Sequence, residues 1–233
     1  PNLRDSPWGT VLFDFTKPHV LSFLRSALDF WITVYHFDGI RYDAVSNLIY
    51  QGGSKDKGLN EPGLWFLRST NFTLQQDHPE VMLIAEDSSD YLKVTAPVAY
   101  GGLGFDYKWN LGWMHDTLDY LATPFAERVG MKNRFLFSMS YFYQENYILP
   151  LSHDEVVHGK KTIIDKLWGS YEQKFAQLRC LYCYMLFHPG KKLSFMGNEL
   201  AEFMEWSEER QPGWNLLDYP VHRSFHIFLQ RLN

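Results

Sequence analysis

The chain has 233 residues, of which 45% are apolar and 21% are charged, a composition typical of a folded globular domain with ample material for a large core. This composition excludes a disordered, collagen-like or coiled-coil protein. Lys and Arg number 22 against 27 for Asp and Glu, so the formal net charge is −5. A negative charge argues against a surface that neutralises nucleic-acid phosphates or anionic lipid, and we expect neither as a partner.

Aromatic residues make up 17% of the chain, which favours aromatic platforms for flat, neutral ligands. No strongly apolar, uncharged window is long enough to span a membrane, and the first residues do not resemble a signal peptide. The two cysteines, Cys180 and Cys183, are too few for a disulfide framework, which favours a reduced, cytoplasmic setting. They have CxxC spacing but no second pair, so we expect them to pack in the core.

The first third of the chain predicts a helix, a strand and a second helix. Between Val20 and Tyr35 apolar residues recur at helical spacing, and Pro18 stands where a helix start tolerates it. The segment FDGIRYDAV predicts a strand near residues 37–44. A polar, glycine-rich segment at about 46–62 is predicted as an excursion outside the core, and a helix at about 63–76 follows.

Four further strands are predicted, in VMLIAED, GFDYKWN, NYILPLSHD and KLSFMGNE, with helices in GWMHDTLDYLA and YEQKFAQLRCLYCYMLFH. Pro150 is unusual inside a strand, because a central strand normally uses every N–H. Strands that alternate with helices indicate βαβ units and a parallel sheet, so we expect an α/β fold. The sequence shows no internal repeat and no linker that would divide it into two domains.

Acidic residues follow four of the predicted strands: Asp43, Glu86, Asp154 and Glu199. In a parallel α/β barrel the carboxyl ends of the strands carry the active site. Any one of these acids could instead cap the next helix. Four of them in register favour an active site.

Two of these acids have neighbours that suit acid–base chemistry. Arg41 and Asp43 share one face of a strand, where the guanidinium stabilises the charged carboxylate that a nucleophile needs; a structural ion pair is the alternative. Glu86 ends an apolar run, so partial burial should raise its pKa and keep a proton available for a general acid. Asp87 could play the same part, because successive strand residues point to opposite faces and nothing local decides between them.

His153 and Asp154 lie in SHDEVVHGK, directly after an apolar strand, and suit the binding of hydroxyl groups. The competing interpretation is a metal site that also uses Glu155 and His158, but no HxxEH or HExxH spacing is present, so we expect no metal. The GGLG segment lacks the third glycine of a dinucleotide-binding loop and precedes a strand. It predicts a turn and no cofactor.

Three segments, DGIRYDAV, MLIAED and LSHDEVVHGK, resemble conserved blocks of the α-amylase superfamily of (β/α)₈ glycosidases and transglycosidases. Longer segments, GGLGFDYKWNLGWMHDTLDY, YFYQENYILPLSHDEVVHGK and KKLSFMGNELAEFMEW, resemble the 1,4-α-glucan (glycogen or starch) branching enzymes within it. The resemblance covers essentially the whole chain.

The resemblance implies that residues 1–233 are the C-terminal part of a (β/α)₈ TIM-barrel catalytic domain, about strands 4 to 8 with their helices, truncated at both ends. The family's first conserved block, an Asp and a His near the end of the third barrel strand, has no counterpart here. Neither do the first strands or the usual β-sandwich domains. These missing parts, the remainder of the same polypeptide, are therefore expected partners.

By resemblance, the nucleophile is Asp43, the general acid/base is Glu86 and the transition-state-stabilising acid is Asp154. Arg41 takes the position beside the nucleophile, and His153 takes the position on the sugar hydroxyls. The implied reaction is a retaining double displacement that transfers an α-1,4-glucan segment to a glucose 6-hydroxyl, without cofactor or metal, in cytoplasmic glycogen biosynthesis.

Two other functions stay open from the sequence. An α-amylase-type hydrolase of α-glucans would share Asp43, Glu86 and Asp154, and only the longer branching-type segments favour transfer. A non-catalytic glucan-binding fragment would use the aromatic residues without turnover. The presence of all three acids argues against that second alternative.

Overall fold

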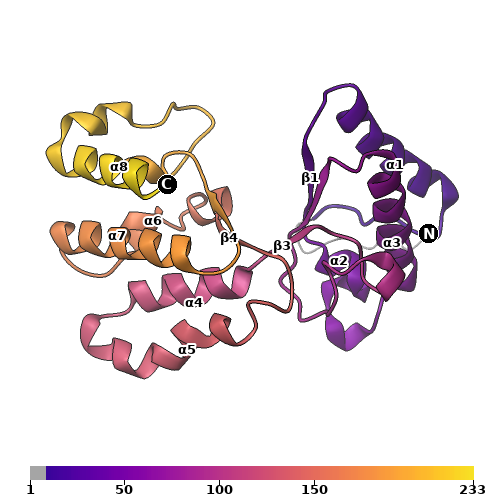
Figure 1. Cartoon of the computed structure of the whole chain (residues 1–233), viewed down its shortest axis with the longest axis horizontal. Coiled ribbons are helices and arrows are strands. Elements are labelled where there is room, and N and C mark those ends of the chain that lie inside the picture. Colours follow the sequence, from indigo (N-terminus) through magenta and orange to yellow (C-terminus); the bar gives the residue numbers. More distant parts are fainter. Residues whose placement is uncertain (1–8) are drawn as a thin grey trace. The chain divides into compact units, whose positions relative to one another are not determined.

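The structure is a computed structural model that describes residues 9–233 of the chain, which form two compact units (Figure 1). The first unit comprises the residues up to 109 together with 143–146, and the second comprises 110–142 together with 147–233. The chain passes from one unit to the other directly after a strand and within a loop, so no linker composition marks the division.

The first unit contains three parallel strands and their helices. Its elements are α1 (Pro18–Thr33), β1 (Gly39–Tyr42), α2 (Ser46–Ile49), α3 (Glu61–Asp77), β2 (Met82–Ala85) and β3 (Tyr107–Trp109). β1 pairs with β2 and β2 pairs with β3, both in parallel. The predicted helices and strands of this part are therefore confirmed.

The segment after β1, predicted as an excursion at about 46–62, begins with α2 and continues as two 3₁₀ turns, Gln51–Gly53 and Lys55–Lys57. An isolated antiparallel bridge between Tyr50 and Leu59 closes it. Ile49 at the end of α2 is fully buried, so the segment is anchored to the core of the first unit by its start.

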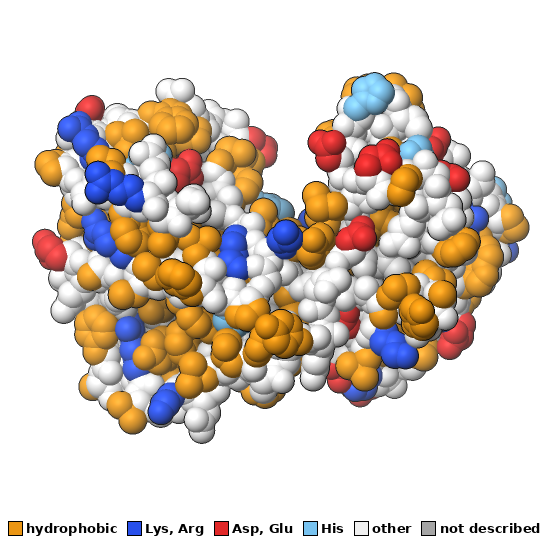
Figure 2. All heavy atoms as spheres, in the orientation of Figure 1, with side chains coloured by type: hydrophobic (Ala, Val, Ile, Leu, Met, Phe, Trp, Pro, Cys, Tyr) orange, Lys and Arg blue, Asp and Glu red, His pale blue; other side chains and the backbone are white. Residues whose placement is uncertain are grey.

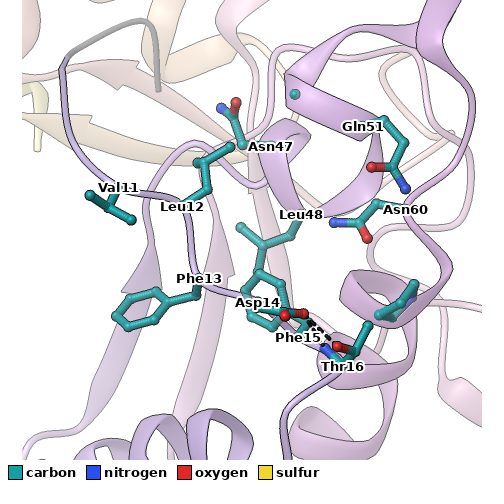
Figure 3. A pocket seen from close by; sticks show the side chains of 12 residues that line it. Val11, Leu12, Phe13, Asp14, Phe15, Thr16, Asn47, Leu48, Gln51 and Asn60 are labelled. Atoms are coloured by element: carbon teal, nitrogen blue, oxygen red, sulfur yellow. Dashed lines mark hydrogen bonds between the residues drawn. The ribbon is translucent and has the colours of Figure 1, made fainter. Parts of the chain in front are cut away.

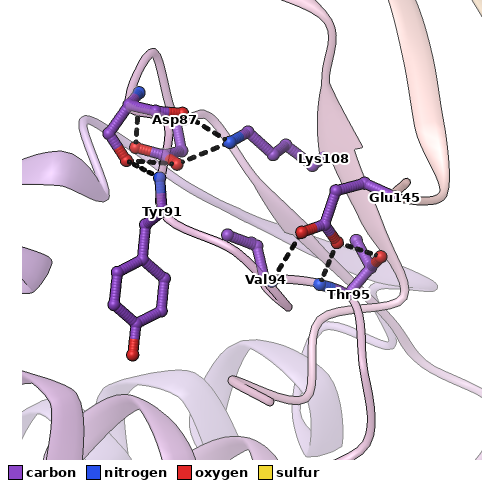
Figure 4. Close-up of polar contacts among 7 residues, drawn as sticks. Asp87, Tyr91, Val94, Thr95, Lys108 and Glu145 are labelled. Carbon is purple, nitrogen blue, oxygen red and sulfur yellow. Dashed lines mark hydrogen bonds and ion pairs between the residues drawn. The ribbon is translucent and has the colours of Figure 1, made fainter. Parts of the chain in front are cut away.

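The connection from β2 to β3 contains no α-helix, and the sequence pattern predicts none between these two strands. It carries a single 3₁₀ turn, Val98–Tyr100. The buried carboxylate of Glu145 accepts hydrogen bonds from the backbone N–H groups of Val94 (2.9 Å) and Thr95 (2.7 Å) (Figure 4). These bonds supply partners that a helix would otherwise provide, so the loop keeps a fixed course.

The second unit contains two parallel strands among helices. Its elements are α4 (Leu111–Ala122), α5 (Lys132–Leu136), β4 (Tyr147–Leu151), α6 (Ile163–Lys166), α7 (Tyr171–Phe187), β5 (Lys191–Ser194) and α8 (Pro220–Leu232), with 3₁₀ turns at Phe125–Met131, Phe137–Ser140, His153–Glu155, Asn198–Leu200 and Trp214–Asp218. β4 pairs with β5 in parallel. The predicted strands and the helices α4 and α7 are confirmed, and so is the α/β class with parallel strands.

Pro150 lies inside β4, and its missing N–H leaves no neighbouring backbone carbonyl without a hydrogen bond. On the edge of β4 away from β5, the carbonyl of Ile148 accepts the N–H of Asn110 at 2.8 Å. The next acceptor along that edge is the carbonyl of Asn110, which instead accepts the N–H of Met114 as α4 begins (3.2 Å). No backbone donor is needed at Pro150, so the residue is tolerated there.

Each unit has its own hydrophobic core. The first core gathers around α3, β1 and β2, with Leu64, Leu67 and Leu83 almost completely buried. The second gathers around α4, β4, α7 and α8. The buried stripe of α7 is Phe175, Leu178, Leu181, Tyr182 and Met185.

Cys180 is exposed and Cys183 is half-buried, so the expected core packing of both cysteines is wrong for Cys180. Helical periodicity explains the error, because Cys180 lies two residues after the buried Leu178 and therefore points away from the stripe of α7. Across the part of the chain that the structure describes, no helix combines the length and the apolar character needed to cross a bilayer.

Exposed apolar side chains gather where α1 leads into β1. They are Phe30, Trp31, Val34, Tyr35 and Phe37, between 44% and 57% exposed. The Trp31 ring contacts those of Tyr35 (4.9 Å between centroids) and Phe37 (5.6 Å). Hydrophobic side chains reach the surface of both units (Figure 2). Among residues 9–233, β1 also pairs along one edge only.

We predict that residues 1–233 expressed alone will self-associate and will not unfold in one sharp transition. The open edge of β1 and the aromatic cluster beside it are surfaces that other chains cover readily. Sedimentation velocity, dye binding to apolar surface and urea unfolding would measure these properties. A monomer that excludes the dye and unfolds in a single steep transition would contradict the prediction.

Candidate active site

β1 and β2 bring Arg41, Asp43 and Glu86 together in the first unit. In the strand register Arg41 pairs with Ile84, and Asp43 and Glu86 directly follow the last pair, Tyr42 with Ala85. The guanidinium Nη2 of Arg41 lies 2.8 Å from Oδ1 of Asp43 and 3.3 Å from Oε2 of Glu86. The predicted common face of Arg41 and Asp43 is confirmed, and Glu86 joins it.

Glu86 is mostly buried, with 20% of its side chain exposed, and its carboxylate accepts the backbone N–H of Ala44 at 2.7 Å. Burial raises the pKa of Glu86, and the nearby Asp43 carboxyl raises it further. The Ala44 N–H and the Arg41 charge oppose this rise without cancelling it. The raised pKa predicted from the sequence is confirmed, and a shift in this direction is the one that a general acid requires.

The Arg41 side chain is held from a third direction by Trp109 at the end of β3. The guanidinium carbon lies 4.3 Å from the centre of the indole ring, within cation–π range. Asp43, by contrast, has 78% of its side chain exposed. Sequence analysis did not single out Trp109; the signal available was its place at the end of a predicted strand.

Asp87 points to the opposite face from Glu86 and is fully buried. Its Oδ2 lies 2.8 Å from the ammonium of Lys108, which is 7% exposed (Figure 4). Asp87 also accepts hydrogen bonds from the hydroxyl and the N–H of Ser89. The local sequence leaves open whether Glu86 or Asp87 faces Arg41 and Asp43. In the structure Glu86 shares their face and Asp87 does not.

His153 and Asp154 belong to the second unit, in the 3₁₀ turn His153–Glu155 that follows β4. His153 Nε2 lies 3.5 Å from Oδ1 of Asp154, and the side chains are 44% and 45% exposed. The His153 ring lies 5.9 Å from that of Phe195, just after β5. Glu199 lies in the turn Asn198–Leu200 that follows β5.

The loop after Asp154 is held by a pair of residues that sequence analysis missed. The Glu205 carboxylate accepts the backbone N–H groups of Gly159 (2.9 Å) and Lys161 (2.5 Å), which lowers its pKa. The N–H of the next residue, Trp206, donates to the carbonyl of Val156 (2.9 Å). Within residues 9–233 no three His, Cys, Asp or Glu side chains are placed to hold a metal ion together.

A cavity of about 470 Å³ lies beside α2 in the first unit (Figure 3). Three amide side chains, Asn47, Gln51 and Asn60, line one part of it, and the segment 11–16 lines another part with apolar side chains and the carboxylate of Asp14. The amides can donate hydrogen bonds to a hydroxylated ligand and accept them from it. Asn47 also donates to the carbonyl of Ala44 at 3.4 Å, beside Asp43.

The fold is that of an α-amylase. The chain superimposes with a TM-score of 0.60 on a noncanonic maltogenic alpha-amylase, AmyB from Thermotoga neapolitana, over 98% of this chain and 47% of that one, at 14% identity. No family model matches the chain.

In sequence, the chain is similar to bacterial enzymes named 1,4-alpha-glucan branching enzyme GlgB. It is 50% identical to that of Geobacillus stearothermophilus over 225 residues, 48% to that of Bacillus subtilis over 225 residues and 46% to that of Halothermothrix orenii over 243 residues. These matches cover 97–100% of this chain. The chain spans 35–39% of the length of these relatives. The resemblance to branching enzymes is confirmed.

We predict that Glu86→Gln will stabilise the intact protein at neutral pH. A raised pKa means that the folded protein binds the Glu86 proton more tightly than the unfolded chain, whose value is near 4.5. Ionisation of Glu86 therefore costs stability as the pH rises through its folded pKa, and the variant escapes that cost. Urea unfolding should show a gain at about pH 8 and little gain at about pH 4. The exposed Glu80→Gln is the control, and a gain confined to acid would contradict the prediction.

Proposed function

We propose that this chain is part of the (β/α)₈ catalytic barrel of a 1,4-α-glucan branching enzyme, about strands 4 to 8, within a longer polypeptide. The intact protein would transfer an α-1,4-glucan segment to a glucose 6-hydroxyl. The observation that carries the proposal is the contact of Asp43 and Glu86 with one guanidinium at the carboxyl ends of two parallel strands. The similarity to enzymes of that name supports it.

The spacing of the two carboxylates favours a retaining mechanism. Two oxygens that contact one nitrogen at 2.8 and 3.3 Å lie at most about 6 Å apart, so the two carboxyl groups can adopt the separation of about 5–5.5 Å that retaining enzymes use.

In the proposed reaction, Asp43 attacks the anomeric carbon while Glu86 gives its proton to the leaving glycosidic oxygen. The exposed Asp43 carboxylate can reach the substrate, and the Arg41 guanidinium lies 2.8 Å from it. The raised pKa of Glu86 suits the proton transfer. In the second step Glu86 takes the proton of an incoming 6-hydroxyl, whose oxygen displaces Asp43 and restores both carboxyl groups.

We assign Asp154 and His153 to the sugar hydroxyls. Both side chains are almost half exposed at the end of β4, as ligand-binding groups require. Hydrogen bonds to ring hydroxyls that strengthen in the oxocarbenium-like transition state stabilise it by several kcal/mol in such enzymes. In this mechanism the carboxyl groups supply the acid, the base and the nucleophile.

The proposed substrate is an α-1,4-glucan such as glycogen or amylose, and the proposed setting is the cytoplasm. The amide side chains in the cavity beside α2 suit hydrogen bonding to a hydroxylated ligand. The proposed partner is the remainder of the same polypeptide, because the relatives are more than twice as long as this chain.

A branching assay on the intact protein tests the function against the hydrolase alternative. Incubation with amylose should create α-1,6 linkages, detected by isoamylase debranching and loss of iodine absorbance, with little release of reducing ends. Release of reducing ends without new α-1,6 linkages would show a hydrolase. Binding of amylose without either change would show a non-catalytic glucan-binding protein.

We predict that Asp43→Ala and Glu86→Gln will each remove nearly all turnover of amylose, because one removes the nucleophile and the other the proton donor. On an α-maltosyl fluoride donor, whose leaving group needs no proton, Glu86→Gln should retain most of its kcat/KM and Asp43→Ala should not. Steady-state kinetics of the intact protein would measure both effects. If Asp87→Asn abolishes turnover while Glu86→Gln does not, the assignment of the acid is wrong.

A further inference from the structure

The buried ion pair of Asp87 and Lys108 lies beside the proposed general acid, and the reaction above does not use it. The exposed fraction is 0% for the Asp87 side chain and 7% for that of Lys108. Burying two charges costs several kcal/mol each unless their hydrogen bonds are satisfied. Here they are, since Asp87 accepts from Ser89 and Lys108 also donates to the Ser89 carbonyl at 2.9 Å.

Two successive residues of β3, Lys108 and Trp109, lie on opposite faces of the sheet. Lys108 pairs with Ala85 in the register and lies on the face of Asp87. Trp109 lies on the other face, where its ring packs on Arg41. One short strand therefore contacts the Arg41 side chain on one face of the sheet and forms the buried ion pair on the other face.

The backbone around Glu86 is fixed on both sides. The N–H of Glu86 donates to the carbonyl of Tyr42 (3.0 Å), and its carbonyl accepts the N–H of Val45 (2.8 Å). Beyond Asp87 the chain turns at Ser89, where the Lys108 ammonium bonds both Asp87 and the Ser89 carbonyl. A backbone rotation that turned the Glu86 side chain away from the face of Arg41 would therefore pull Asp87 from its buried partner.

We propose that Lys108 is a positioning residue for Glu86. By holding Asp87 on the opposite face, the Lys108 ammonium fixes the Glu86–Asp87 peptide and keeps the Glu86 carboxyl on the face of Arg41 and Asp43. This inference rests on the proposed role of Glu86 as the proton donor. Loss of Lys108 should therefore slow only the glycosyl donors whose leaving group needs a proton, because only they depend on the position of the Glu86 carboxyl.

The test is Lys108→Met in the intact protein, with kcat/KM measured on amylose and on α-maltosyl fluoride. This parameter reports the first displacement, in which fluoride leaves as an anion and needs no proton from Glu86. A small misplacement of a catalytic group can cost about 100-fold, so we expect a loss of about 100-fold on amylose and less than about 3-fold on the fluoride. A merely structural role would lower both values equally.

Two further variants separate positioning from folding. Lys108→Met leaves a buried carboxylate without its partner and can prevent folding, so Asp87→Asn is combined with it to remove both charges. The double variant should fold, judged by its thermal unfolding, and should keep the selective loss on amylose. Lys55→Met, which breaks the exposed pair of Lys55 with Asp90, is the matched control and should leave kcat/KM unchanged on both donors.

Equal losses on both donors, or wild-type kcat/KM on amylose in the double variant, would overturn the proposal. A wild-type protein that turns over the fluoride and cleaves amylose without making α-1,6 linkages would refute the branching function. The comparison of kcat/KM on the two donors would still test the role of Lys108. A wild-type protein that turns over neither donor would refute both.

Discussion

The contact of one guanidinium with two carboxylates organises the first unit. Arg41 lies within 3.3 Å of both Asp43 and Glu86, and the Trp109 ring packs on it from the side. Two carboxylates this close repel each other when both are ionised, and the cation between them offsets that repulsion. The balance leaves Asp43 exposed and Glu86 buried with a raised pKa. Different environments for two acids are the basis for giving them different chemical roles.

Because successive strand residues point to opposite faces of the sheet, two neighbouring acids also lie in different environments. Glu86 and Asp87 are adjacent in the chain and both are acids, yet one faces Arg41 and the other forms a buried pair with Lys108. The loop that follows them is anchored by Glu145 rather than by a helix of its own. Rigid support behind a reacting group preserves its alignment, which is where such sites gain much of their effect.

The second unit repeats the same local design with different residues. His153 and Asp154 follow β4 at once, and Glu205 and Trp206 hold the loop beyond them through its backbone. In both units a strand delivers the polar side chain and a neighbouring segment fixes the loop after it. The similarity to part of an α-amylase fold agrees with this arrangement, because the active sites of (β/α)₈ barrels lie at the carboxyl ends of the strands.

The sequence by itself predicted the five strands, the helices α1, α3, α4 and α7, and the common face of Arg41 and Asp43, because periodicity and strand alternation are local properties. The burial that raises the pKa of Glu86 could also be predicted, from the apolar run before it. Only the tertiary structure decided between Glu86 and Asp87, because the decision depends on Lys108, 21 residues further along the chain. The same holds for Trp109 on Arg41, for Glu145 in place of a helix and for Pro150 in β4, where the missing N–H has no acceptor to serve. Each depends on a partner that is distant in the sequence and that no local pattern identifies.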